Sequence, residues 1–313
     1  MVFLGTAAAQ PTARRSTASL LIRHGAQRLL IDCGEGTQRQ MQRSTGLVAL
    51  DTIFLTHYHA DHYLGLPGLL KTYNLCARGA PLQIAGPPGL VGLFDSMRRI
   101  LGRTDYPIEL IELEADEPMA YADFAIRSFP VKHSATAYGY ALVEPDRPGR
   151  LDAEKAIALG VSSGPAMGAL QRGETVAGRD GPVRSDQVIG PARAGRKLVV
   201  SGDTAPCSAT AAAAAGAQLL IHEATFVDSE RDRAEQTGHS TARQAALLAA
   251  DAGVEQLALV HISSRHHVAA VLEQAREEFA GAIAPRDFDL IELLQPERGG
   301  ARLVAAGALP PKR

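Results

Sequence analysis

The sequence predicts an α/β protein in which helices cover two packed β-sheets. Short strand-like runs occur in both halves of the chain of 313 residues, and segments with helical spacing lie between them. Hydrophobic residues make up 46% of the chain, which is enough apolar material to bury a sizeable core. A polar region rich in glycine and proline separates the two halves, and we expect it to be an insertion.

The first half consists of short strands and turns. Residues 19–23 and 28–32 flank a His-Gly turn and predict a hairpin. Residues 51–56 form a compact run of apolar and β-branched side chains, which predicts a buried strand. The other elements expected here are helices at 65–77 and 88–101 and strands at 81–86, 122–131 and 138–143.

The region from about residue 145 to about residue 195 has a different composition. It carries many Gly, Pro, Arg and Ser residues and little periodicity, so it predicts a partly extended excursion without a long helix. Residues 145–198 contain nine Lys or Arg and six Asp or Glu, whereas the whole chain has a formal net charge of −2. The overall charge does not indicate a nucleic-acid-binding protein, so a polyanion would have to bind a local basic patch.

The alternation of strands and helices returns after this region. Ser240 is the expected N-cap of a helix that runs to Ala252, because a serine hydroxyl can accept a hydrogen bond from the first turn. The other expected elements are a helix at 267–279 and strands at 197–201, 218–221, 257–260 and 289–293.

The cysteines Cys33, Cys76 and Cys207 are scattered and form no Cys-x-x-Cys pair. This pattern argues against a disulfide framework or a thiolate zinc site and fits a reducing cytoplasm. The N-terminus lacks the basic and apolar regions of a signal peptide. The longest apolar stretch, residues 211–221, is too short to span a bilayer, so we expect a cytoplasmic protein without membrane association.

The sharpest feature is the run Thr56-His-Tyr-His-Ala-Asp-His62, which follows an expected strand. His57 and His59 are two residues apart, so in an extended backbone both side chains point to the same side. Asp61 and His62 follow after a turn and can face a second point nearby. This mixture of imidazole and carboxylate groups suits two divalent ions, whereas a purely structural role would gather four costly polar groups at a strand end.

One loop cannot complete two metal sites, because a catalytic zinc needs about three protein ligands. His133 and His261 each follow a strand-like run and can each supply one further ligand. Asp203 follows another such run and could bridge both ions with its two carboxylate oxygens. His222 also follows a strand-like run. Residues just past strand ends gather at one edge of a sheet, where side chains from distant segments can converge.

The order of these residues resembles the metallo-β-lactamase superfamily: His-x-His-x-Asp-His, a later His, then Gly-Asp-Thr, and a final His after a strand. The resemblance implies an αββα sandwich of two mixed sheets flanked by helices, with two zinc ions per subunit at the sheet edge. It also divides the ligands between the ions: His57, His59 and His133 hold one zinc, Asp61, His62 and His261 hold the other, and Asp203 bridges them.

Further motifs resemble the bacterial ribonuclease Z family of tRNA 3′-end endonucleases. They include Phe3-Leu-Gly-Thr6, Asp32-Cys-Gly-Glu-Gly-Thr-Gln38, His222-Glu-Ala-Thr-Phe226 and Gly238-His-Ser-Thr241. The resemblance implies one metallo-β-lactamase domain over residues 1–313, a homodimer, and hydrolysis of precursor tRNA that removes the 3′ trailer.

Segments of the basic region, such as Leu170-Gln-Arg-Gly-Glu-Thr-Val176, resemble the flexible arm that clamps the tRNA body in this family. The resemblance therefore implies a tRNA-binding arm inserted at about residues 146–196. Arginine side chains would meet phosphates at a distance from the metals. The arginines expected to do so are Arg147, Arg150, Arg172, Arg179, Arg184, Arg193 and Arg196.

Phosphodiester hydrolysis needs an activated water, a proton acceptor and an acid for the leaving group, and zinc can supply hydroxide at neutral pH. Asp61 is a candidate ligand near that water, so we expect it to accept the proton. The resemblance places His239 near the site, and we expect it to protonate the leaving 3′-oxygen. Glu223, beside His222, either orients a histidine or only holds the strand end. Asp32 is either a partner of a ligand histidine or a plain turn residue.

Two other interpretations remain open. The same metals would serve a small-molecule hydrolase, such as an arylsulfatase or a phosphodiesterase, although a small substrate needs no distant basic clamp. A non-catalytic RNA-binding protein is disfavoured, because unpaired buried carboxylates and imidazoles would destabilise the fold without metal.

Overall fold

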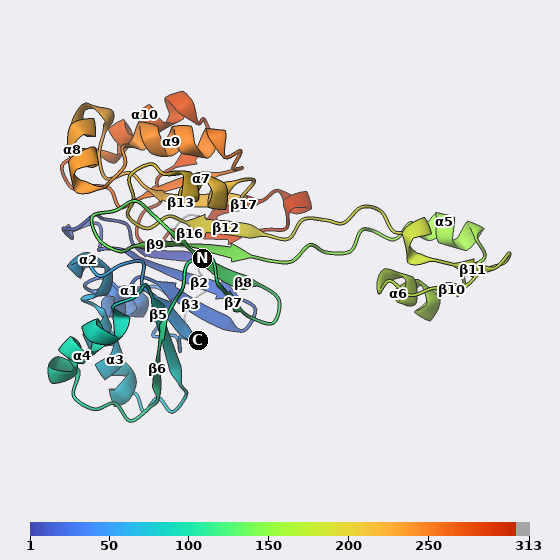
Figure 1. Ribbon diagram of the computed structural model, residues 1–313, viewed down its shortest axis with the longest axis horizontal. Coiled ribbons are helices and arrows are strands. Elements are labelled where there is room, and N and C mark those ends of the chain that lie inside the picture. Colours follow the sequence, from blue (N-terminus) through green and yellow to red (C-terminus); the bar gives the residue numbers. More distant parts are fainter. Residues whose placement is uncertain (305–313) are drawn as a thin grey trace. The chain divides into compact units, whose positions relative to one another are not determined.

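Two mixed β-sheets pack face to face in the larger of two compact units of the chain (Figure 1). The computed structural model describes residues 1–304, and the larger unit contains residues 1–143 and 197–304 of these. The first sheet contains, in spatial order, β17 (Ala301–Val304), β16 (Leu290–Leu293), β1 (Val2–Gly5), β2 (Ser19–His24), β3 (Gln27–Ile31), β4 (Thr52–Phe54), β5 (Leu82–Gly86) and β6 (Ile108–Glu112).

The second sheet has seven strands and carries most of the C-terminal half of the unit. Its members are, in spatial order, β15 (Ala282–Ile283), β14 (Leu257–Val260), β13 (Leu219–Glu223), β12 (Lys197–Val200), β9 (Tyr138–Val143), β8 (Ala125–Pro130) and β7 (Pro118–Ala120). Strands β3 to β6 of the first sheet are parallel, and so are β12 to β15 of the second. Each parallel run therefore places the carboxyl ends of several strands at one edge.

Side chains alternate between the two faces of each sheet because the strand period is two. Leu29 of the first sheet and Leu219 of the second both belong to the core between the sheets. Their sequence neighbours Leu30 and Leu220 face outward, and each belongs to a separate core under helices. All four side chains are fully buried, so each sheet is covered on both faces.

Helices cover the two outer faces (Figure 1). The first sheet packs against α1 (Thr37–Arg43), α3 (Leu66–Leu75) and α4 (Leu90–Leu101), and the second against α7 (Ser208–Ala214), α9 (Ala242–Asp251) and α10 (Val268–Glu278). Two short helices, α2 (Ala60–Tyr63) and α8 (Arg231–Thr237), complete this unit. The arrangement confirms the predicted αββα sandwich of two mixed sheets.

The smaller unit, residues 144–196, is inserted between β9 and β12. It contains α5 (Ala153–Ala158), α6 (Pro165–Gln171) and a two-stranded sheet of β10 (Val176–Ala177) and β11 (Pro182–Val183). The unit has no long helix, as expected, but its two short helices and its small sheet were not predicted. These elements are too short to give a periodic pattern, and a small core of their own holds them together, formed by Ala156, Val161, Leu170, Val183 and Val188.

The start of α9 and the end of β13 differ from the sequence prediction. The N-cap of α9 is Thr241, whose hydroxyl accepts a hydrogen bond from the amide of Gln244. Ser240 does not cap the helix, because its hydroxyl donates to the carbonyl of Thr204 at 2.6 Å. His222 lies within β13 and does not follow it. Among the described residues, no helix is long and apolar enough to cross a membrane.

Candidate metal centre

The predicted ligands meet where strands of both sheets end. His57 comes shortly after β4, and His59, Asp61 and His62 follow around the short helix α2. The remaining three, His133, Asp203 and His261, come after β8, β12 and β14 of the second sheet. An isolated bridge between Lys132 and Ala205 joins the segments that follow β8 and β12, which brings His133 beside Asp203.

Three imidazole nitrogens converge in a first group. The Nδ1 atom of His59 lies 3.0 Å from Nε2 of His57 and 3.1 Å from Nε2 of His133. His57 is buried, whereas His59 is exposed, so solvent reaches this group from the side of His59. Three nitrogens at these distances could hold one metal ion and leave a further position open, as catalytic zinc sites do.

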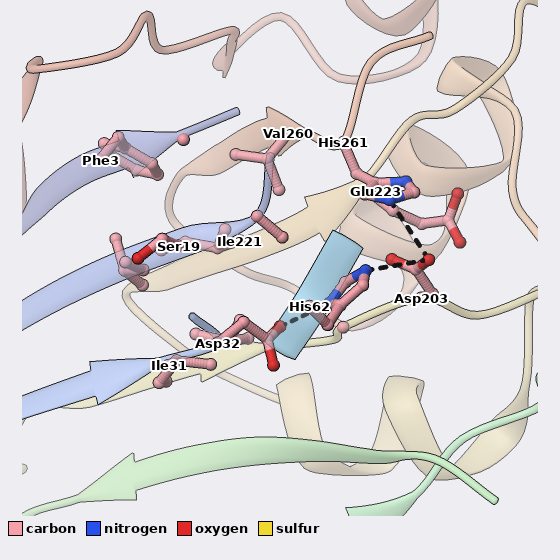
Figure 2. Close-up of a pocket in the computed structure, with 15 residues that line it drawn as sticks. Phe3, Ser19, Ile31, Asp32, His62, Asp203, Ile221, Glu223, Val260 and His261 are labelled. Atoms are coloured by element: carbon pink, nitrogen blue, oxygen red, sulfur yellow. Dashed lines mark hydrogen bonds and ion pairs between the residues drawn. The ribbon is translucent and has the colours of Figure 1, made fainter. Parts of the chain in front are cut away.

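A second group contains two imidazoles and two carboxylates. Nε2 of His261 lies 3.2 Å from Oδ2 of Asp61 and 3.3 Å from Oδ2 of Asp203. Nε2 of His62 lies 3.4 Å from each of the same two oxygens, and Figure 2 shows its contact with Asp203. This nitrogen is buried, makes no hydrogen bond of good geometry with a described residue, and faces into the group. Oδ2 of Asp203 also lies 3.9 Å from Nε2 of His57, so this oxygen faces both groups.

The electrostatics of the two groups suit cations. Burial lowers the pKa of His57 to about 2, helped by the neighbouring His62, so this imidazole is neutral. Burial raises the pKa of Asp203, but His261 and His62 outweigh it and keep the pKa well below its usual range. Burial likewise raises the pKa of Asp61, and the neighbouring His261 and His62 lower it more. Burial lowers the pKa of His62, but Asp203 and Asp32 outweigh it and raise the pKa well above its usual range. Metal binds neutral imidazoles and ionised carboxylates, so an ion would displace a proton from His62.

Asp32 contacts the second group through His62, on the side of the ring that faces away from the other candidate ligands. Its Oδ2 atom lies 2.8 Å from Nδ1 of His62, the ring nitrogen that faces away from the group (Figure 2). Asp32 is buried and has a φ of 58°, in the left-handed region that non-glycine residues rarely adopt. Of the two roles left open for Asp32, the structure therefore supports the partner of a ligand histidine.

The segment that contains His239 closes one side of the centre. Gly238 has a φ of 72°, and a Cβ atom there would lie 3.0 Å from the amide nitrogen of Ser134. The carbonyl of Gly238 lies 2.8 Å from Nδ1 of His133, so this glycine lets the chain approach and support a ligand. The ring of His239 lies 5.0 Å from that of His133 and 5.5 Å from that of His261, measured between centroids.

Glu223 holds His239 in place. Its Oε1 atom lies 2.9 Å from Nδ1 of His239, and its two oxygens also accept hydrogen bonds from the amides of Thr204 and Ser240. Burial lowers the pKa of His239, but the Glu223 carboxylate outweighs it and raises the pKa to about 9. These contacts are made by Nδ1 of His239, and no described residue bonds to its Nε2 atom.

His222 lies apart from the converging ligand atoms of the described residues. Its ring is fully buried, and its Nδ1 atom lies 2.8 Å from the carbonyl of Glu223. His222 therefore helps to hold the end of β13, whereas Glu223 orients His239. The sequence analysis does not single out Thr56 or Thr225, although both hydroxyls lie close to ligand histidines. Their place beside the ligand motifs is the only signal in the sequence.

Comparisons with known proteins agree with this fold and site. The family model described as the metallo-beta-lactamase superfamily matches residues 12–222, so the chain has the fold of that class of metal-dependent proteins. Ribonuclease Z of Myxococcus xanthus is 45% identical over 287 residues, which are 90% of this chain and 94% of that protein. Ribonuclease Z of Haloferax volcanii is 45% identical over 305 residues, 95% of this chain and 96% of that protein. The chain belongs to the ribonuclease Z family.

A solved structure gives the same fold. The crystal structure of human tRNase Z, short form, superimposes with a TM-score of 0.66 and 24% sequence identity. The superposition covers 97% of this chain and 98% of the human one. At this level of identity the likeness supports the fold alone, and the site rests on the geometry described above.

Proposed function

We propose that this protein is a metal-dependent endoribonuclease that cleaves precursor tRNA on its 3′ side and removes the 3′ trailer. The observation that carries the proposal is the convergence of seven ligand side chains in a chain of the ribonuclease Z family. The name of the human neighbour, tRNase Z, points to the same substrate class. The finer assignments below are parts of this proposal.

The metal is proposed to be zinc, with two ions in each subunit. His57, His59 and His133 would hold one ion, and Asp61, His62 and His261 the other. Imidazole and carboxylate ligands without thiolates suit zinc, and Asp203 would bridge the pair. When bound, two zinc ions lower the pKa of a water molecule and neutralise charge on the phosphate. The chain itself must then position proton acceptors and donors around the phosphodiester.

Asp61 and His239 are proposed to handle the two protons of the reaction. Asp61 is only partly buried, so we propose that its carboxylate reaches the attacking water and accepts a proton from it. His239 is held protonated at neutral pH by Glu223, and its Nε2 atom is free to donate to the leaving 3′-oxygen.

The inserted unit, residues 144–196, is proposed to bind the body of the tRNA. Four of its arginines are exposed, and two of these, Arg150 and Arg179, make no side-chain hydrogen bond with any described residue. Arg172 pairs with Glu174, and Arg184 pairs with Asp186, at exposed positions where water screens the pairs. The other three arginines stabilise the fold of the unit, because their side chains bond to its backbone or to Glu144: Arg147, Arg193 and Arg196.

A homodimer and a cytoplasmic location complete the proposal. A second copy of the chain would cover apolar side chains on the outer helices of the first sheet. Four of the seven large apolar side chains exposed in residues 1–304 lie on or beside α2, α3 and α4: Leu64, Leu75, Val91 and Ile100. The three cysteines are free thiols, which fits a reducing compartment.

The test offers the purified protein a 3′-extended tRNA and a chromogenic small phosphodiester side by side, with and without a chelator. We expect cleavage of the tRNA at its 3′ side, loss of cleavage with the chelator, and recovery when zinc is added. Efficient turnover of the small substrate with an intact tRNA would instead indicate the small-molecule hydrolase. RNA binding without cleavage of either substrate would indicate the non-catalytic protein.

A further inference from the structure

We propose that Thr56 and Thr225 are positioning residues that orient one ligand histidine at each metal site through the same hydrogen-bond relay. In each relay a buried carboxylate accepts a hydrogen bond from a threonine hydroxyl. The same hydroxyl accepts a hydrogen bond from Nδ1 of a ligand histidine, the ring nitrogen that faces away from the metal site. The inference rests on the proposed metal ligands and adds a role for two residues that do not touch metal or substrate. Both threonines are at most 5% exposed, so water cannot replace these bonds easily.

The first relay starts at Asp32. Oγ1 of Thr56 lies 2.9 Å from Oδ2 of Asp32 and 3.0 Å from Nδ1 of His57. Asp32 is itself fixed by the amide of Thr56, which donates to Oδ1 at 2.8 Å. The same carboxylate bonds Nδ1 of His62 directly, at 2.8 Å. Asp32 therefore supports one ligand of each ion, one directly and one through Thr56.

The number of protons fixes the direction of the relay. Thr56 has one hydroxyl hydrogen, and Asp32 is the only neighbour that cannot itself donate, so this hydrogen goes to Asp32. The hydroxyl oxygen then accepts the hydrogen on Nδ1 of His57. That hydrogen leaves Nε2 of His57 with its lone pair directed into the first ligand group. The contact of 3.3 Å between Thr56 and Nδ1 of His62 is not used, because His62 has the shorter bond to Asp32.

The second relay repeats this arrangement at Glu223. Oγ1 of Thr225 lies 2.5 Å from Oε2 of Glu223 and 2.9 Å from Nδ1 of His261. The hydroxyl hydrogen goes to the carboxylate, and Nδ1 of His261 donates to the hydroxyl oxygen, so Nε2 of His261 faces the second group. The other oxygen of Glu223 bonds His239 at 2.9 Å. One carboxylate thus supports a metal ligand through Thr225 and the proposed acid directly.

The two relays predict site-selective effects. Thr225 reaches only the second group, through His261, whereas the relay bond of Thr56 reaches the first group, through His57. His261 also has a φ of 54°, so its backbone is in a sparsely populated region and its ring depends on side-chain support. Loss of a partner behind a ligand histidine typically weakens metal affinity about 10- to 100-fold.

The experiment titrates the metal-free protein with Co²⁺ and follows the visible absorption of the bound ion. Thr225→Val has nearly the same shape but no hydroxyl, and Thr225→Ser keeps the hydroxyl as the matched control; Thr56→Val and Thr56→Ser form the second pair. We expect Thr225→Val to weaken one binding step about 10- to 100-fold and to spare the other. We expect Thr56→Val to weaken the opposite step and both Ser variants to bind like the wild type. His133→Ala identifies which step belongs to the first group.

Thermal unfolding of the metal-free variants separates a local effect from a general loss of stability. The inference is overturned if the Val variants bind both ions like the wild type, or if they weaken both steps equally. It is also overturned if the Ser variants fail as the Val variants do. A wild-type protein that binds two ions but does not cleave tRNA would contradict the proposed function and leave the relays standing.

Discussion

The two compact units of the chain are built in different ways. The larger unit has three extensive apolar cores, and the candidate ligands converge at one edge of its sheets. The unit of residues 144–196 has a single small core and contributes no ligand, but it exposes four arginines. We therefore propose that the chemistry depends on side chains held by the two sheets, and that the binding of the tRNA body depends on the exposed arginines of the smaller unit. Substitutions in the two units should separate cleavage from tRNA binding.

The largest expected effect comes from the oxygen that faces both ligand groups. Asp203→Asn replaces a carboxylate with a neutral amide, so both ions should be held weakly. Cleavage of precursor tRNA and of a small phosphodiester should fall together by about ten-thousandfold or more, because bound metal lowers the activation barrier by several kcal/mol. The measurement is kcat/KM for both substrates, with metal content determined on the same samples. Retention of two ions and of activity would remove Asp203 from the centre.

The next largest effect should come from His239, and it should be limited to the protonation of the leaving 3′-oxygen. His239→Asn keeps a polar side chain but cannot act as an acid, and we expect kcat for tRNA to fall about a thousandfold with little change in KM. A small phosphodiester with a nitrophenolate leaving group needs little protonation, so its cleavage should change much less. Metal content should stay at the wild-type value. An equal loss with both substrates would argue against the role of His239 as an acid.

Replacement of the smaller unit tests whether residues 144–196 serve tRNA binding and not the chemical step. Val143 and Lys197 are direct partners in the pairing of β9 and β12, so an Asn-Gly turn in place of residues 144–196 would join the strands as a hairpin. We expect kcat/KM for precursor tRNA to fall about a hundredfold through KM, because the arginines proposed to bind the tRNA phosphates would be absent. Cleavage of the small phosphodiester should remain. Loss of both activities would contradict the separation of chemistry and binding.

The smallest effect should come from individual arginines. Arg150→Ala with Arg179→Ala removes two exposed cations that no described partner holds, and we expect about a tenfold rise in KM for tRNA at low salt. The slope of log KM against log salt should become less steep by about two, because each of the two arginines would neutralise one phosphate. The matched control is Arg193→Ala, whose side chain bonds to the carbonyl of Pro148 and should affect thermal stability more than salt dependence. Wild-type salt dependence in the double variant would exclude a role for these two arginines in phosphate binding.

Much of the larger unit could be predicted from the sequence, because its signals are local. The run from His57 to His62 carries four ligands within six residues, and the strands before His57, Asp203 and His261 show as apolar runs. The structure brings all seven candidates into two groups. The positions of strand ends were less predictable: β13 continues through His222, because its backbone pairs with β14 up to Glu223.

The rest depends on contacts between residues that are distant in the sequence. Thr56 and Thr225 act through Asp32 and Glu223, and nothing in a run of residues shows which hydroxyl will face which ring. Ser240 has the right chemistry for an N-cap, but Thr204 takes its hydroxyl, so Thr241 caps α9. In the smaller unit, helices of six and seven residues are too short for periodicity and depend on a shared core.

The central claim is that seven side chains of the larger unit hold two divalent ions. Anomalous diffraction at the zinc edge, from crystals of the protein loaded with Zn²⁺, tests it most directly. The account predicts two peaks about 3.5–4 Å apart, one beside His57, His59 and His133 and one beside Asp61, His62 and His261, with Asp203 between them. A single peak, or peaks at other residues, would contradict it.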